Sequence, residues 1–212
     1  MHEGRPGKGC ARCRPYAGLV VRSSFSLSWV VDEQLEFVKQ IASRLASAEI
    51  NYMMTGSMAM AVYATPRMTR DIDVVIESRP EHVDTIVRLF ETDCYVSRDA
   101  VRDATETQGM FNVIHNEWII KADFIVRKDS PHHLVEFERR REIDVQGTPV
   151  AVVAPEDLIL SKLDWARESG SELQRRDVQN IIAAVGDLDW DYLEQWADQL
   201  QLGETLEQVR QG

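Results

Sequence analysis

The sequence predicts a mixed α/β (α+β) domain over residues 31–153, followed by a small helical region over residues 154–212. In the first region, short apolar runs with a period of two alternate with helical stretches, which predicts a mixed sheet with flanking helices. From Pro155 onward only helical patterns remain. The 212 residues, of which 44% are hydrophobic, suffice for one domain with a full core or for a domain with a helical appendage.

The first elements of the predicted domain lead to a candidate site. An apolar stripe at helical spacing predicts a helix over residues 32–49, and the apolar NYMMT of residues 51–55 predicts a buried strand. Gly56 permits a tight turn, and we expect Ser57 to be the N-cap of the helix that follows. The next strand is expected at DIDVVIE, residues 71–77.

The remaining elements follow from the same patterns, in chain order. A helix is expected after Pro80, a short strand at CYVS, and a polar helix or loop at RDAVRDATETQ. MFNVIH and WIIKADFIVR predict two strands joined at Asn116-Glu117, PHHLVEFERRR predicts a helix, and EIDV with PVAVV predicts a hairpin around Gly147. In the helical region the predicted helices are PEDLILSKLDWARES, ELQRRDVQNIIAAV, DWDYLEQWADQL and LGETLEQVR.

The net charge of −11 and the lack of long apolar runs argue against a membrane protein and against a general binder of nucleic acid. No apolar run is long enough to span a bilayer, so we expect a cytoplasmic protein with no membrane partner. Residues 186–212 are strongly acidic, with Arg210 as their only basic residue. An acidic chain is a poor general binder of nucleic acid, because that affinity rests on neutralised phosphates, although a local basic groove remains compatible with the sequence.

Residues 1–30 are expected to form a disordered tail that contributes little to the fold. They are rich in Gly, Arg and Ser and do not resemble a signal peptide, and it stays open whether they belong to the native protein. Cys10 and Cys13 form an isolated C-x-x-C, which supplies too few ligands for a zinc site. Cys94 is expected in the core, and a disulfide-stapled secreted domain is not indicated.

Two features combine in the segment TGSMAMAVYATPRMTRDIDVVI, residues 55–76. The Gly56-Ser57 turn opens a helix, whose free N–H groups favour an anion such as a phosphate. Side chains alternate along a strand, so Asp71 and Asp73 share one face, and paired carboxylates suit Mg²⁺. Taken singly, the turn is more often a plain cap and the Asp-x-Asp a solvated strand face. Together they indicate a site for a nucleotide and a metal ion.

A third carboxylate is expected on a neighbouring strand. Asp123 lies within KADFIV, and alternation places it on the same face as Lys121 and Ile125. An Asp inside a central strand is costly unless it is paired or bound to a metal, so Asp123 is the candidate third metal ligand. A salt bridge to a nearby arginine is the alternative. Asp129 and Asp144 rank lower, because strand ends are readily solvated.

Charged residues outside the acid pair are candidates for contact with the nucleotide. Lys162, in the middle of an apolar helix, either extends to solvent or reaches the triphosphate as a point charge. Asp177 either pairs with Lys162 or contacts the nucleotide. Arg67 and Arg70 precede the acid pair and are suited to neutralise phosphate charge, although for Arg67 a surface position is favoured.

These residues together resemble a known group. The Gly-Ser turn followed by Asp-x-Asp resembles the nucleotidyltransferase (polymerase-beta-like) superfamily. The longer pattern, which includes FNVIHNEWIIKADFIV and APEDLILSKLDWARESGSELQRRDVQNI, is similar to the AbiEii-type toxin nucleotidyltransferases and their uncharacterised relatives over residues 33–185. The resemblance implies a nucleotidyltransferase-like mixed sheet. It implies that Gly56 and Ser57 hold the triphosphate and that Asp71, Asp73 and Asp123 bind the metal. It also implies that Lys162 and Asp177 belong to a helical motif near the nucleotide.

The resemblance also implies an activity. It points to an enzyme that moves an NMP group from an NTP to an acceptor hydroxyl with two Mg²⁺ ions about 3.5–4 Å apart, which Mn²⁺ can replace. It further suggests the toxin of a toxin–antitoxin system, with an antitoxin as partner. The NTP, the oligomeric state and the acceptor (tRNA, a protein or a small molecule) stay open. The alternative is a catalytically degenerate nucleotide-binding or interaction protein of the same fold.

Overall fold

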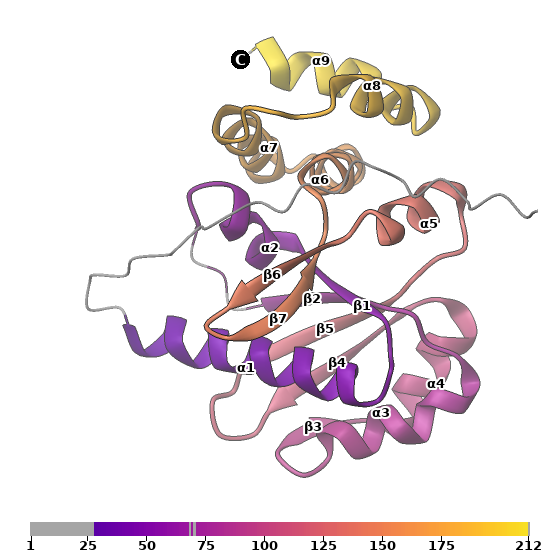
Figure 1. Ribbon diagram of the computed structural model, residues 1–212. Helices are drawn as coiled ribbons and strands as arrows, with labels where there is room; N and C mark the ends of the chain where they lie inside the picture. The colour runs from indigo at the N-terminus through magenta and orange to yellow at the C-terminus, as the bar shows by residue number, and fades with distance from the viewer. Residues whose placement is uncertain (1–27, 68, 70, 212) are drawn as a thin grey trace, which may run out of the picture.

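The computed structural model describes residues 28–67, 69 and 71–211, and Figure 1 shows their arrangement. A seven-stranded mixed sheet forms the centre of this part of the chain. Its strands, in sheet order, are β3 (Cys94–Val96), β4 (Met110–His115), β5 (Lys121–Val126), β2 (Asp71–Ile76), β1 (Tyr52–Thr55), β7 (Thr148–Val152) and β6 (Arg141–Val145). The predicted mixed sheet is confirmed, and β6 and β7 form the predicted hairpin around Gly147.

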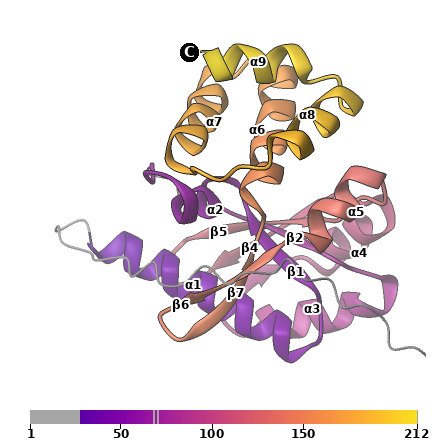
Figure 2. The ribbon, with the colours of Figure 1, turned by 45° about the horizontal axis from the view of Figure 1, so that its top comes forward.

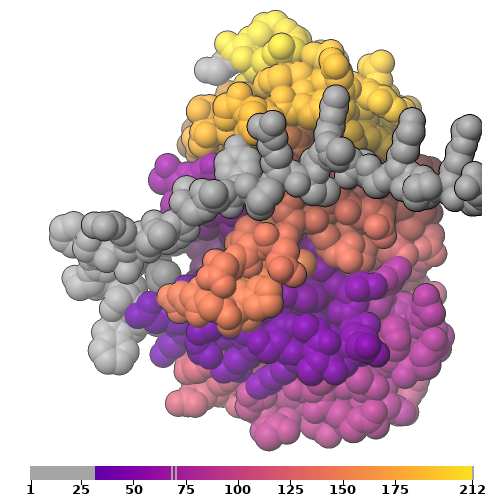
Figure 3. Space-filling view, viewed as in Figure 1, coloured from indigo at the N-terminus to yellow at the C-terminus, as the bar shows by residue number. Residues whose placement is uncertain are grey.

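Helices cover both faces of the sheet (Figures 1 and 2). On one side lie α1 (Ser28–Ser47), the short 3-10 helix η1 (Pro80–His82), α3 (Val83–Phe90) and α4 (Arg98–Thr107). On the other side lie α2 (Gly56–Tyr63), α5 (Pro131–Glu138), α6 (Pro155–Ser169), α7 (Glu172–Ala184), α8 (Trp190–Gln199) and α9 (Gly203–Gln211). Figure 2 shows α6 to α9 grouped above the sheet, and in the space-filling view of Figure 3 the yellow α8 and α9 form the top of the molecule.

The pairing of β2 with β5 fixes the geometry of the candidate site. These strands run parallel, with Asp71 opposite Lys121 and Asp73 opposite Asp123. β1 is antiparallel to β2 and places Thr55 opposite Asp73. Because residues directly opposite in register point to the same side of a sheet, the three aspartates share one face. This is the face toward which α2 and the helical region are packed.

Two apolar cores hold the helices on the sheet. The first lies between the sheet and α1, α3 and α4, where the ring of Phe124 stacks on that of Phe111 with 5.1 Å between centroids. The second lies on the opposite face and joins Met53 of β1 and Met60 of α2 to apolar residues of α6 to α9. Burial of one large apolar side chain contributes about 1.5–3 kcal/mol. The helical region is therefore attached to the domain by a core of its own.

The structure differs from the sequence prediction at the start of the chain. Helix α1 begins at Ser28, inside the predicted tail, and its backbone joins the predicted helix without a break. Residues 1–27, with Cys10 and Cys13, lie outside the described residues. Cys94 is buried as predicted, and burial raises the pKa of its thiol to about 11.

Two single elements complete the comparison with the sequence. The polar segment predicted as a helix or a loop is a helix over residues 98–107, in which the Ser97 hydroxyl accepts a hydrogen bond from the Ala100 N–H and caps the first turn. Strand β5 begins at Lys121, so residues 116–120 form a longer connection than the predicted Asn116-Glu117 turn. No helix in the described part of the chain is long and apolar enough to cross a bilayer.

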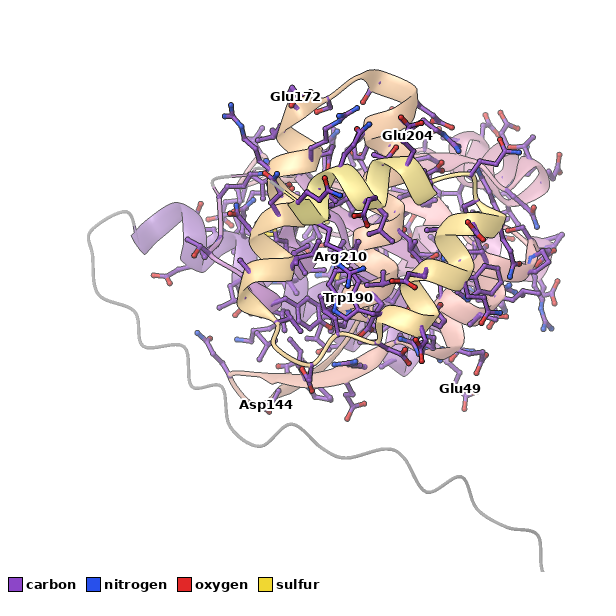
Figure 4. The ribbon with its side chains drawn as sticks, turned by 90° about the horizontal axis from the view of Figure 1, so that it is seen from above. Glu49, Asp144, Glu172, Trp190, Glu204 and Arg210 are labelled. Carbon is purple, nitrogen blue, oxygen red and sulfur yellow. The ribbon has the colours of Figure 1, made fainter. Side chains whose placement is uncertain are left out.

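A buried polar cluster joins α5 to α6 and α8. The guanidinium of Arg139 donates from Nε to Asp157 and from Nη2 to Glu156, each at 2.9 Å. It also lies over the ring of Tyr192, 3.8 Å from the centroid, while the Tyr192 hydroxyl donates to Asp157. Asp157 is fully buried, so its carboxylate depends on these partners. Within the helical region, Arg210 of α9 similarly stacks on Trp190 and lies 3.0 Å from Glu194 of α8 (Figure 4).

Removing the centre of this cluster tests its contribution to stability. We expect Arg139→Ala to lower the free energy of unfolding by about 2–4 kcal/mol in urea titrations, because two buried carboxylates lose their cation. The loss of unfolding free energy should be smaller than that for a fully buried ion pair, since the Arg139 side chain is 30% exposed. Arg98→Ala, which breaks an exposed ion pair with Asp84, should cost about 0–1 kcal/mol. Equal losses of unfolding free energy in both variants would contradict the stabilising role of the cluster around Arg139.

Glu136 of α5 makes stability depend on pH. It is buried and accepts a hydrogen bond from the Ser161 hydroxyl, and burial raises the pKa of its carboxyl to about 8. A raised pKa favours the folded state while the group is protonated, and this stability is lost as pH rises through the folded pKa. Relative to Glu136→Gln, the wild type should lose unfolding free energy as pH rises from about 4.5, the ordinary pKa of a Glu carboxyl, to about 8, its pKa in the folded protein. Glu138→Gln, an exposed neighbour, should follow the wild-type profile.

Candidate functional site

The turn after β1 requires glycine at position 56. Helix α2 begins at Gly56, whose φ is +64°, in the left-handed region that favours glycine. A Cβ at this position would lie 2.0 Å from Oδ2 and 2.7 Å from Cγ of Asp73. The backbone of the turn and the carboxyl group of Asp73 are therefore in direct contact. This contact joins the first half of the predicted motif to the second.

Ser57 does not have the predicted role of N-cap. Thr55 occupies the N-cap position with extended backbone angles, and its side chain makes no capping hydrogen bond. Ser57 lies in the first turn of α2, where it is buried and its hydroxyl accepts a hydrogen bond from Arg67 Nη2 at 2.5 Å. The prediction was wrong by two residues because the left-handed angle of Gly56 lets the helix begin one residue before Ser57.

The three predicted carboxylates are brought together on one face. Asp71 and Asp73 lie on β2, and Asp123 lies opposite Asp73 on β5. Neighbouring strands are about 4.8 Å apart, so Asp73 and Asp123 are within reach of one ligand. Asp123 is buried, Asp73 is half-buried, and Asp71 is exposed at the start of its strand. The structure thus places the residues as the sequence predicted, and their role as metal ligands stays a prediction.

Lys121 and Asn112 are partners of Asp123 that the sequence analysis did not single out. Lys121 Nζ donates to Asp123 Oδ2 at 2.8 Å and lies 3.5 Å from Asp71 Oδ1. Asn112, opposite Asp123 on β4, donates to its other oxygen. The expected alternative, an arginine against Asp123, is not what the described residues show. The register of β4 with β5 places Asn112 beside Asp123. The sequence predicted that these two strands are joined, but it did not predict their register.

Negative charge accumulates at Asp73. The pKa of its carboxyl is raised to about 6, first by burial and then by the nearby charges of Asp123 and Asp71. Lys162 and Lys121 act against this shift. Within the described residues, no three Asp, Glu, His or Cys side chains are grouped closely enough to hold a metal ion as they stand. The Lys121 ammonium group instead bridges Asp71 and Asp123.

The cationic side of the site comes from the helical region and from the segment after α2. Lys162 of α6 is 3% exposed and donates to Asp177 at 2.7 Å and to Gln174 at 3.0 Å, both on α7. It does not extend to solvent, and burial lowers the pKa of its ammonium group. Arg67 Nε donates to the same Asp177 oxygen at 3.1 Å. Arg67 is thus partly exposed, at 29%, but it is paired with Asp177 instead of lying free at the surface. Arg70 lies outside the described residues.

The chemistry of these two sides defines a class of protein. A glycine-serine turn lies between a carboxylate trio on a mixed sheet and two cations, Arg67 and Lys162, so the arrangement suits a triphosphate held beside acidic groups. Such a combination is expected of a nucleotidyltransferase. Residues 30–210 match the family described as "Nucleotidyltransferase of unknown function (DUF6036)", and the chain belongs to this family.

Solved structures agree on the fold. A nucleotidyltransferase-like antigenic protein from Paracoccidioides brasiliensis is 16% identical, with a TM-score of 0.56 over 84% of this chain and 92% of that chain. The antibiotic-resistance factor ANT(2'')-Ia is 12% identical, with a TM-score of 0.53 over 84% of this chain and 93% of that chain. At these identities the likeness shows the fold alone. Among curated proteins no match is found. The narrower placement among AbiEii-type toxins stays a prediction.

The contact between Gly56 and Asp73 can be tested by adding one methyl group. Gly56→Ala should lower the unfolding free energy by about 2–4 kcal/mol, since it combines a left-handed backbone with a steric clash. The matched control is Gly186→Ala, because a Cβ at Gly186 would meet nothing within 4 Å. Chemical denaturation of both variants provides the measurement. If Gly56→Ala is no less stable than the control, the close packing of the turn against Asp73 is refuted.

Proposed function

We propose that the protein is a Mg²⁺-dependent nucleotidyltransferase that moves an NMP group from an NTP to an acceptor hydroxyl. The observation that carries this proposal is the placement of Asp73 opposite Asp123 on parallel strands, with Gly56 packed against Asp73. Because glycine has no side chain, the phosphates can approach the backbone at Gly56 closely. The two carboxylates lie at the point where the transferred phosphate would then be held.

The residues present fit a divalent cation. Asp71, Asp73 and Asp123 offer hard carboxylate oxygens, which Mg²⁺ prefers. Burial and the charges of Asp123 and Asp71 together raise the pKa of Asp73 to about 6, so a cation bound beside it would favour its ionised form. Lys121, whose side chain is 40% exposed, is free to leave its present partners when a stronger cation binds. When bound, the metal would neutralise charge on the transferred phosphate. Mn²⁺ is expected to substitute.

Within this proposal the protein groups have separate tasks. Ser57 and the first turn of α2 bind the phosphates, and Asp123 accepts the proton of the acceptor hydroxyl or orients that hydroxyl. Asn112 keeps Asp123 in place by a hydrogen bond to one of its oxygens, and Lys121 holds the other oxygen until the metal binds. Arg67 and Lys162 offset the negative charge of the triphosphate from the side opposite the acids.

The charge distribution favours a small-molecule or protein acceptor over tRNA. Nucleic-acid binding requires basic side chains that are free to contact phosphates. Many arginines and lysines among the described residues instead pair with carboxylates, and the helical region is acidic. The pairs include Lys39–Glu36, Arg44–Asp93, Arg98–Asp84, Arg102–Asp99, Arg167–Asp164 and Arg210–Glu194. The toxin role and an antitoxin partner rest on the sequence resemblance and stay predictions.

One observation favours the second candidate, a nucleotide-binding protein without catalysis. Lys121 already neutralises Asp123 and lies near Asp71, as a lysine would in a site that has lost its metal. The presence of all three aspartates speaks for the enzyme. Measuring NTP binding and turnover on the same preparation separates the two candidates, because the degenerate protein binds nucleotide and transfers nothing.

Replacement of Asp73 tests the activity directly. With each α-labelled NTP, Mg²⁺ and a cell extract, we expect Asp73→Asn to lower label transfer by roughly a hundredfold or more. The variant should fold as well as the wild type, since it removes a charge that burial disfavours. Asp129→Asn, at a solvated strand end, is the control and should retain transfer. Transfer that persists in Asp73→Asn, or in the wild type with EDTA, would contradict the proposal.

A further inference from the structure

We propose that Arg67 is the side chain of this site that contacts the triphosphate directly, and that Asp177 and Lys162 act by positioning it. This inference rests on the nucleotidyltransferase function proposed above and assigns the phosphate-binding role within it. It differs from what the sequence resemblance implies, in which the helical lysine lies next to the nucleotide. The assignment follows from burial, hydrogen bonds and the count of charges around one carboxylate.

Arg67 is accessible to a ligand, whereas Lys162 is not. The Arg67 side chain is 29% exposed, and it lies against Ser57 in the first turn of α2. The Lys162 side chain is 4% exposed, and it is enclosed by Gln174 and Asp177. A phosphate oxygen can therefore reach the guanidinium group as the protein stands. It could reach the Lys162 ammonium group only after α6 and α7 had moved.

Asp177 holds both cations with the same oxygen. Its Oδ2 accepts from Lys162 Nζ at 2.7 Å and from Arg67 Nε at 3.1 Å. One carboxylate neutralises one cation, and Lys162, which is buried beside it, makes the shorter bond. Asp177 therefore cannot neutralise both cations. The charge of Asp73 also acts on Lys162, so the cation left with the weaker counter-charge is the more exposed one, Arg67. A triphosphate is a ligand of the opposite sign.

The geometry of the guanidinium group leaves donors for such a ligand. Arginine has five N–H groups in a planar fork, and the bonds to Asp177 and Ser57 start from Nε and Nη2. Fixing the fork at Nε sets the plane in which the remaining N–H groups point. Asp177 thus orients Arg67, and Lys162 fixes the position of the Asp177 carboxylate by a hydrogen bond to the same oxygen. These two residues position Arg67 without contact with the substrate.

This arrangement makes the helical region part of the site. Asp177 and Lys162 lie on α7 and α6, whereas Ser57 belongs to the α/β domain, and Arg67 connects the two. Helix α2 also packs against α6 and α7. The triphosphate site would accordingly be complete only when both regions are docked. A helical region that served as a mere appendage would not need a buried ion pair at this junction.

Binding measurements on the full chain test the role of Arg67. Calorimetry with Mg²⁺ and either ATP, CTP, GTP, UTP or inorganic tripolyphosphate gives the affinities. Arg67→Ala should weaken binding of the preferred NTP and of tripolyphosphate alike, by about tenfold to a hundredfold, as expected for loss of a charged hydrogen bond. The matched control is Arg44→Ala, which removes a partly buried arginine paired with Asp93 on the other side of the sheet. It should bind as the wild type does.

A double-mutant cycle tests the positioning role of Asp177. Asp177→Asn alone should weaken tripolyphosphate binding, but it should have no further effect in the Arg67→Ala background, because Asp177 acts through Arg67. Independent, multiplying effects of the two changes would overturn the positioning role. If Asp177→Asn does not fold, Asp177→Glu replaces it in the cycle, since it keeps the charge that Lys162 requires and displaces the carboxylate from Arg67.

The outcomes distinguish this inference from the function on which it rests. If the wild type binds an NTP and Arg67→Ala binds it equally well, the role of Arg67 is refuted and the proposed function survives. If Arg67→Ala weakens binding of the NTP but not of tripolyphosphate, the contact between Arg67 and the phosphates is likewise refuted. If the wild type binds none of the four NTPs and no tripolyphosphate, both proposals fail.

Discussion

The packing of Gly56 against the carboxyl group of Asp73 is the constraint on which the site depends. No side chain larger than hydrogen fits between the turn and the acid, since a Cβ would lie 2.0 Å from Oδ2. The contact fixes the end of β1 relative to β2, and the parallel register of β2 with β5 then places Asp123. The same turn starts α2 and so sets the position of Ser57, to which Arg67 is bonded. Acidic and cationic groups are thereby held on opposite sides of one backbone turn.

Much of the fold follows from local patterns in the sequence. Period-two alternation correctly placed Asp71 and Asp73 on one face of a strand and Asp123 on a face with Lys121. Helical spacing correctly located the helices after Pro155. These properties depend on neighbours a few residues apart, which is why they can be read from the chain alone. The strand order could not be predicted, because it depends on pairings such as β1 with β7, which are separated by most of the domain.

Two features of the site do not follow from local sequence patterns. Ser57 was expected to cap α2 and Arg67 to lie at the surface, yet Ser57 Oγ accepts from Arg67 and Arg67 reaches Asp177. Local propensity correctly favours serine as a cap and arginine as an exposed residue. The left-handed backbone of Gly56 moves the N-cap to Thr55. A carboxylate that is 110 residues distant in the sequence holds the partly exposed Arg67. A side chain that contacts the second region of the protein cannot be placed until that region is docked.

The buried pair of Lys162 and Asp177 strengthens the functional interpretation for an energetic reason. Removing two charges from water is costly, and apolar residues of similar size often serve stability equally well or better, so such a pair is weak support for a purely structural role. The second core already attaches α6 and α7 to the sheet through apolar contacts. What apolar residues cannot supply is an ionised carboxylate at the junction between the two regions. Asp177 provides this charge, and its second cation, Arg67, is the one that a ligand can reach.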